Sequence, residues 1–172
     1  PAGERRYLML CADGGVLSVT LDEDGGELSK TRTAGYFDPE GDPITEAGVR
    51  YGDQWLFVSF GGMIHPLDVS GATLQFEDSW SLLTDADRDE NWRIAGKQHL
   101  VIHQATSRLY SLVRQSEEPL DDPGDMDGTE IWVYDLESRQ RVQRMEAVPK
   151  QEDEEIRATT GIGSTSGDGA SG

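Results

Sequence analysis

Apolar and polar residues alternate with a period of two in three stretches of the chain, and each stretch contains two such runs around a polar turn. This period is typical of β-strands, and Gly, Asp and Ser in the turns favour antiparallel neighbours joined by hairpins. The paired runs are 7–11 with 16–22, 55–60 with 63–68, and 109–113 with 131–135. The pattern therefore predicts one sheet-forming unit that is written three times.

Each unit closes on an aspartate before a second polar turn. These residues, Asp22, Asp68 and Asp135, are about 46 and about 67 residues apart, and omitting an insertion of roughly 15–20 residues around 115–129 makes the two intervals similar. Such a period falls in the range of four-stranded propeller blades. We expect each carboxylate to accept backbone N–H groups in its turn, which is a structural role.

Further short apolar runs extend the units into four-stranded blades. Residues 49–51 and 100–103 supply inner strands, and residues 73–76 and 141–145 supply outer strands. The predicted fold is all-β, with about three four-stranded blades of a β-propeller at residues 1–37, 47–80 and 98–148. Because known propellers close with about four to eight blades, the predicted ring is incomplete.

The segments between and after the units are polar. Residues 38–43 contain two prolines and a glycine and are predicted to form a loop, whereas residues 81–90 predict a short helix capped by Thr84. The insertion at 115–129 is acidic without a basic residue, so we expect an exposed loop. Residues 149–172 are first acidic and then rich in Gly and Ser, which predicts a flexible tail.

Composition and charge narrow the classes of partner. The 172 residues include 20 Gly and 7 Pro, and only 35% are hydrophobic, which favours a turn-rich β protein. The formal net charge of −18 opposes binding to nucleic acid and to anionic membranes. This acidity fits solubility or adaptation to high salt, or a dedicated site for a cation or a basic partner. We expect neither a membrane span nor a signal peptide within the chain.

Five acidic residues are weak candidates for metal binding. Asp85, Asp87 and Asp89 imitate the first ligands of an EF-hand, but Glu90 and Gly96 occupy the positions that need Gly and a bidentate Glu. Asp125 and Asp127 are close together without a complete ligand register. We therefore assign no metal site, no bound cofactor and no catalytic residue to the chain.

The remaining reactive or aromatic side chains predict structural roles. Cys11 cannot form an internal disulfide because it is the only cysteine, and its apolar surroundings predict a core residue. The histidines are His65, His99 and His103; the last two lie in a predicted strand, about 13 Å apart along the chain and too far apart for one zinc ion. Trp55, Phe57, Trp132 and Tyr134 alternate along strands and predict core packing.

Several segments of the chain carry a family resemblance. They are 62–70, and 83–98 with the strand at 100–103, followed by 108–113 and 133–137. In these segments the chain resembles the heavy, β-propeller subunit of the quinoprotein amine dehydrogenases, the methylamine and aromatic amine dehydrogenase family. The run Leu-Thr-Asp-Ala-Asp-Arg at 83–88 is the most family-specific part, and the resemblance covers most of residues 7–148.

The resemblance implies a segment of a periplasmic, seven-bladed heavy subunit without cofactor. Such a subunit scaffolds a small, disulfide-rich light subunit that carries tryptophan tryptophylquinone and oxidatively deaminates primary amines. Electrons then pass to a small copper protein or a cytochrome. A second hypothesis, which rests on the clustered acidic residues alone, is a non-enzymatic propeller-like interaction module.

Overall fold

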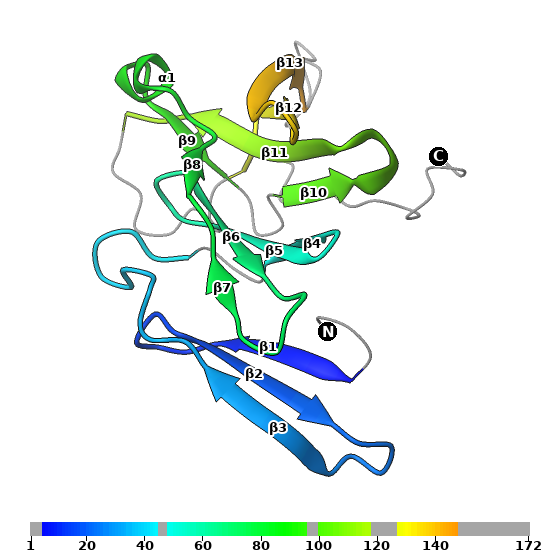
Figure 1. Ribbon diagram of the computed structural model, residues 1–172. Coiled ribbons are helices and arrows are strands. Elements are labelled where there is room, and N and C mark those ends of the chain that lie inside the picture. The colour runs from blue at the N-terminus through cyan, green and yellow to red at the C-terminus, as the bar shows by residue number, and fades with distance from the viewer. Residues whose placement is uncertain (1–4, 45–47, 96–99, 118–126, 148–172) are drawn as a thin grey trace. The chain divides into compact units, whose positions relative to one another are not determined.

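The computed structural model describes residues 5–44, 48–95, 100–117 and 127–147. The chain divides into two compact units, residues 1–59 with 64–79 and residues 60–63 with 80–172. The all-β prediction is confirmed, because the described elements are antiparallel strands apart from one short helix and one 3-10 turn (Figure 1). Within the described residues, no helix is long and apolar enough to cross a membrane.

The first sheet is a meander of three strands among the described residues. Its strands are β1 (Arg6–Leu10), β2 (Val16–Leu21) and β3 (Glu27–Arg32), in the order β1-β2-β3. The turn between β1 and β2 requires glycine, since Gly14 has φ +80° and a Cβ there would lie 2.2 Å from the carbonyl oxygen of Phe37. The fourth strand predicted for this blade is not seen in the described residues.

The second sheet also follows the predicted meander. Its strands β4 (Val49–Tyr51), β5 (Gln54–Val58), β6 (Met63–Asp68) and β7 (Gln75–Phe76) are neighbours in this order. The predicted inner strand at 49–51 is confirmed. The predicted outer strand at 73–76 is reduced to its last two residues, because Leu74 is buried in the core rather than paired in the ladder.

One apolar cluster joins the two sheets of this unit. Its buried members are Val16, Phe37, Phe57, Leu67, Val69 and Leu74. Full burial of side chains of this size stabilises the folded state by about 1.5–3 kcal/mol each. The prediction that Cys11 lies in the core is wrong: it is only half-buried, and the preceding residues Met9 and Leu10 of β1 are exposed as well. Trp55 packs against the cluster while remaining partly exposed.

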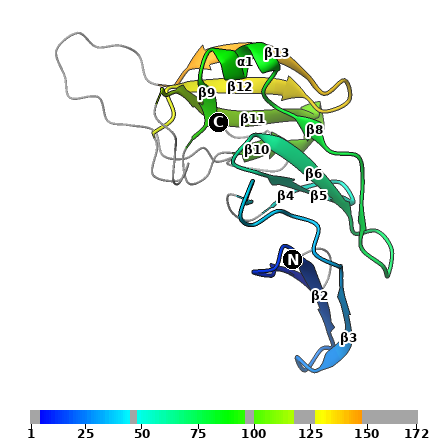
Figure 2. The ribbon, with the colours of Figure 1, turned by 90° about the vertical axis from the view of Figure 1, so that its left-hand side faces the viewer.

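The second unit contains the third sheet and the helix. Its elements are β8 (Trp80–Ser81), α1 (Asp85–Asp89), β9 (Trp92–Ile94), β10 (Leu100–His103), the 3-10 turn η1 (Gln104–Thr106), β11 (Arg108–Gln115), β12 (Glu130–Asp135) and β13 (Gln140–Glu146). Strands β10 to β13 lie side by side in this order and β9 pairs with the end of β11 (Figure 2). The predicted strands at 100–103 and 141–145 and the predicted helix are thus confirmed.

Candidate functional site

One face of the third sheet gathers aromatic and basic side chains from β9, β12 and β13. Strand β12 contributes Trp132 and Tyr134, which alternate onto the same face and are 0% and 2% exposed. In the register with β13, Trp132 lies opposite Arg144 and Tyr134 lies opposite Arg141. A shift in register between Val133 and Tyr134 accounts for two arginines three residues apart sharing one face. The prediction that Trp132 and Tyr134 are packed in the core is confirmed.

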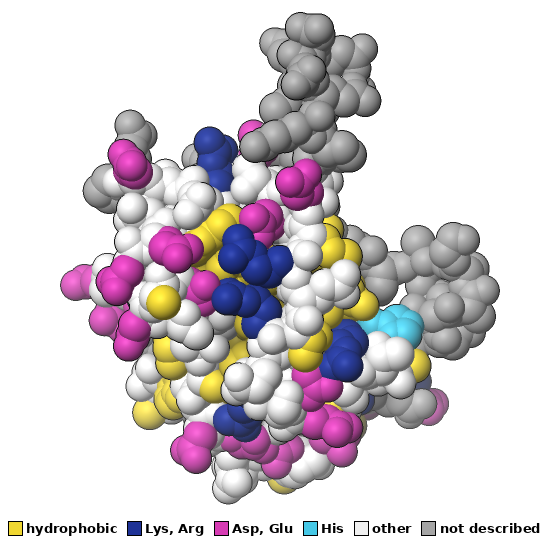
Figure 3. Space-filling model, turned by 90° about the horizontal axis from the view of Figure 1, so that it is seen from above, with side chains coloured by type: hydrophobic (Ala, Val, Ile, Leu, Met, Phe, Trp, Pro, Cys, Tyr) yellow, Lys and Arg dark blue, Asp and Glu magenta, His cyan; other side chains and the backbone are white. Residues whose placement is uncertain are grey.

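The guanidinium groups lie over the indole rings. Arg141 is 4.0 Å from the ring centre of Trp132, and Arg144 is 4.7 Å from Trp92 and 4.9 Å from Trp132. The two indole centres are 4.9 Å apart, so the arginines cover one continuous aromatic surface. Contacts of this kind contribute about 0.5–2 kcal/mol each, depending on how well water is excluded. In Figure 3, which looks down on the side of α1, β12 and β13, basic side chains gather over apolar ones.

Carboxylates neutralise both arginines from within the unit. Glu130 accepts two hydrogen bonds from Arg144, at 2.9 and 3.1 Å, and one from the indole nitrogen of Trp132 at 2.6 Å. Burial of Glu130 raises its pKa, but the hydrogen bonds from Arg144 and Trp132 outweigh burial and hold that pKa below its usual value. Glu130 is therefore a carboxylate at neutral pH, and its negative charge pairs with Arg144 within the sheet.

Asp87 connects the helix to the outer strand. Its carboxylate accepts the backbone N–H and the hydroxyl of Thr84 at 2.8 and 2.7 Å, and the Thr84 hydroxyl accepts the backbone N–H of Asp87 at 3.1 Å. The second carboxylate oxygen accepts a hydrogen bond from Arg141 at 2.8 Å. Burial raises the pKa of Asp87, but the bonds from Thr84 and Arg141 outweigh it and the pKa lies below its ordinary value. This capping box fixes the start of α1.

Arg88 holds the preceding turn. It donates hydrogen bonds to the carbonyl oxygens of Leu83 at 2.7 Å and Gly61 at 3.2 Å, and to the hydroxyl of Ser81 at 2.7 Å. The hydroxyl of Tyr134 donates to the carbonyl of Leu82 at 2.8 Å, and burial raises the pKa of this hydroxyl. The segment 81–95 is thus attached to the rest of the unit at several points.

The three closing aspartates have the predicted structural role. Asp22 accepts the backbone N–H of Gly26 at 2.6 Å, Asp68 that of Ser70 at 2.8 Å, and Asp135 that of Ser138 at 2.8 Å. The bond from Ser138 is the largest cause of the lowered pKa of Asp135, and the bond from Ser70 has the same effect on Asp68. Asp135 also forms an ion pair with Arg108.

The weak candidates for metal binding have different surroundings in the structure. Asp87 is occupied as described, whereas Asp85 and Asp89 are exposed on α1, with Asp85 at 3.7 Å from Arg88. Asp127 is half-buried, and Asp125 lies outside the described residues. In the described part of the chain no three His, Cys, Asp or Glu residues form a group that could hold a metal ion.

A hydrogen-bonded group around His65 was not predicted from the sequence. The Ser79 hydroxyl lies 2.8 Å from Nδ1 of His65 and 3.0 Å from the hydroxyl of Tyr36. The imidazole packs edge-on against Tyr36 and Phe37, with ring centres 5.6 and 5.4 Å away. Burial lowers the pKa of His65, partly offset by the charge of Asp42. His99 lies outside the described residues, and His103 contacts the Thr106 hydroxyl at 2.7 Å.

Sequence comparison associates the chain with one family over most of its length. The family described as "Methylamine dehydrogenase heavy chain (MADH)" matches residues 1–153. The methylamine dehydrogenase heavy chain of Methylorubrum extorquens is 25% identical over 114 residues, which are 65% of this chain and 27% of that protein. The corresponding protein of Paracoccus versutus is 28% identical over 120 residues, 69% of this chain and 28% of that protein.

The solved structures that match the chain include two longer proteins of low sequence identity. The β-propeller domain of Cps50 (Swd1) from Myceliophteria thermophila has a TM-score of 0.49 at 14% identity, over 86% of this chain and 39% of that chain. A europium-containing methanol dehydrogenase has a TM-score of 0.46 at 16% identity, over 84% of this chain and 31% of that chain.

Proposed function

Because the chain belongs to the methylamine dehydrogenase heavy chain family, we propose that it is a segment of the non-cofactor heavy subunit of a periplasmic amine dehydrogenase. In this proposal it scaffolds a light subunit that carries tryptophan tryptophylquinone. The quinone supplies the redox chemistry by which primary amines are oxidatively deaminated, and a small copper protein or cytochrome accepts the electrons. The chain spans 27% and 28% of the curated relatives' length, so the activity is that of a larger assembly.

The observation that carries the proposal is the family match over residues 1–153. The ion pairs within the second unit agree with a scaffolding role. Asp87 and Glu130 are occupied by Arg141 and Arg144, so these carboxylates are engaged in holding strands and helix together rather than facing a substrate. The segment 81–95, which is hydrogen-bonded to the rest of the unit at several points, is suited to presenting a defined surface to a partner subunit.

The test is purification from the native source through an affinity tag on this chain. We expect a small, cysteine-rich protein with a quinone absorption band to co-purify in a fixed ratio. A variant Asp87→Asn, which loosens α1, should retain less of the light subunit than the matched variant Asp85→Asn, whose side chain is exposed. A colourless chain without such a partner, under conditions that preserve the fold, would contradict the proposal.

A further inference from the structure

Strand β3 forms an exposed edge of the first sheet. The order β1-β2-β3 gives it one neighbour among the described residues, and all six of its residues from Glu27 to Arg32 are exposed. An edge strand of this length offers main-chain donors and acceptors to a further strand. The side chains of β3 determine which added strand is compatible with this edge.

The register identifies the main-chain groups that face outward. The N–H of Thr33 donates to the carbonyl of Val16 at 3.0 Å, and Thr31 lies opposite Ser18 in the ladder. In an antiparallel pair, alternate residues direct both main-chain groups toward the neighbour. The N–H and C=O groups of Lys30 and Arg32 are therefore turned away from β2, toward the free edge.

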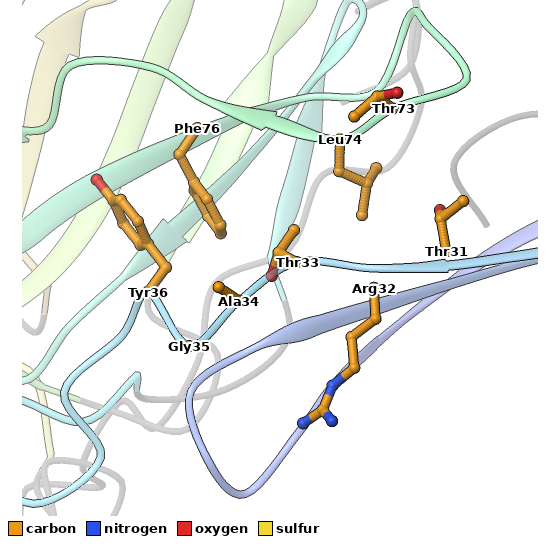
Figure 4. Close-up of a pocket in the computed structure, with 9 residues that line it drawn as sticks. All are labelled: Thr31, Arg32, Thr33, Ala34, Gly35, Tyr36, Thr73, Leu74 and Phe76. Carbon is orange, nitrogen blue, oxygen red and sulfur yellow. The ribbon is translucent and has the colours of Figure 1, made fainter.

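A hollow lies beside this edge within the same unit. It has a volume of about 320 Å³ and is bordered by the chain from Thr31 to Tyr36 on one side and by Leu74 and Phe76 on the other. Figure 4 shows Leu74 and Phe76 directed toward the 31–36 segment, whereas Arg32 points away from them. The rings of Tyr36 and Phe76 stack with centres 3.8 Å apart, which gives the hollow an aromatic end.

The alternation of side chains gives an added strand two different faces. On one face it would meet Lys30 and Arg32, which are directly opposite Val19 and Leu17 of β2. On the other face it would meet Thr31 and Thr33, and beyond them the apolar border of the hollow. Complementary residues are acidic on the first face and apolar on the second.

A second copy of the chain does not fit this edge. Antiparallel pairing of two β3 edges through their outward groups, in the registers centred on Lys30 or on Thr31, would set Lys30 opposite Lys30 or Arg32 of the other copy. Like charges directly opposite each other in a ladder are destabilising. The edge therefore discriminates against self-pairing and favours a chain of opposite charge.

We propose that β3 binds an extended segment of a partner protein in which acidic and apolar residues alternate, adding it as a fourth strand to the first sheet. The acidic side chains pair with Lys30 and Arg32, and the apolar ones cover the hollow beside Leu74 and Phe76. Arg32 already contacts Asp13, but its side chain is 49% exposed, and a guanidinium carries five N–H donors, so Arg32 can also donate to a carboxylate of the added strand. The net charge of −18 repels an acidic segment, but salt of about 0.15 M screens this repulsion for exposed charges more than about 8 Å away.

The test uses the 172-residue chain and the peptide acetyl-Val-Glu-Val-Glu-Val-Glu-Val-amide carrying a fluorescent label. Binding is measured by anisotropy, and backbone hydrogen exchange by NMR locates the peptide. We expect saturable binding, with slower exchange at the amides of Lys30 and Arg32. The same peptide N-methylated at its glutamates retains the charges but lacks the N–H groups that would join the ladder, and should not bind.

A charge exchange separates this site from general electrostatic attraction. The double variant Lys30→Glu, Arg32→Glu should lose about tenfold or more in affinity for the glutamate peptide and gain affinity for the corresponding lysine peptide. Binding of the lysine peptide also shows that the variant is folded. The proposal is overturned by absence of binding at millimolar peptide, by equal binding of the N-methylated peptide, or by exchange protection elsewhere than β3.

Discussion

The link between Asp87 and Arg141 is the part of the candidate site whose contribution can be worked out from the structure. Loss of a capping side chain costs about 1 kcal/mol, exposed ion pairs contribute about 0–1 kcal/mol, and breaking a buried pair costs about 3–5 kcal/mol. The Arg141 side chain is 27% exposed and that of Asp87 is 6% exposed, so this pair lies between the two limits. We expect Asp87→Ala to lower the free energy of unfolding by about 2–3 kcal/mol.

A double-mutant cycle isolates the ionic contribution. Asp87→Asn keeps an oxygen that can accept the hydrogen bonds from Thr84. Arg141→Met keeps an apolar side chain over Trp132, where the guanidinium of Arg141 lies 4.0 Å from the ring centre. Urea unfolding followed by tryptophan fluorescence should give a coupling free energy of about 1–2 kcal/mol. Asp85→Asn serves as the matched control and should change the stability by less than about 0.5 kcal/mol.

The dependence on pH gives an independent check. Since the pKa of Asp87 is lowered in the folded chain, its contribution is complete above its unfolded pKa of about 3.9 and is lost as the pH falls through the folded value. The difference in stability between the original chain and Asp87→Asn should therefore shrink below about pH 4. Additive single variants, with a coupling below about 0.5 kcal/mol, or a difference that does not change with pH, would refute the reasoning.

Three further predictions concern the first unit. Gly14→Ala should lower the free energy of unfolding by more than about 2 kcal/mol in urea titrations, because φ is +80° and the new Cβ would meet the Phe37 carbonyl. His65 should titrate below about pH 6.5 in NMR spectra, and the stability due to its lowered pKa should be lost as the pH falls from that value through its folded pKa. The isolated chain should associate through the first sheet, where Tyr7 and Met9 are 44% and 47% exposed, and Tyr7→Lys with Met9→Lys should reduce the apparent mass in light scattering.

The meanders and their turns could be predicted from the sequence because they depend on neighbours in the chain. Period-two alternation identified the central strands, and Asp22, Asp68 and Asp135 were recognised as turn residues because their acceptors lie two to four residues from the donors. The capping role of Thr84 follows from the same local chemistry. The family likeness was also visible, since it rests on the run at 83–98.

Contacts between distant residues could not be predicted in this way. Arg141 and Asp87 are separated by 54 positions, and only the register of β12 with β13, including its shift at Val133, brings the arginine to the helix. Asp87 was considered as a metal ligand because its neighbours are acidic; the fold gives it a threonine and an arginine instead. Cys11 was expected in the core because its neighbours are apolar, but the fold leaves Met9 and Leu10 of this strand exposed and Cys11 half-buried.

The sequence by itself thus determined the strands, the turns and the family, because hydrogen bonding within hairpins and side-chain alternation are encoded over a few residues. The tertiary structure decided which charges neutralise one another, how Ser79 meets His65 and Tyr36, and that every residue of β3 is exposed. These features depend on strand order and register, which place side chains from remote positions within a few ångströms of each other.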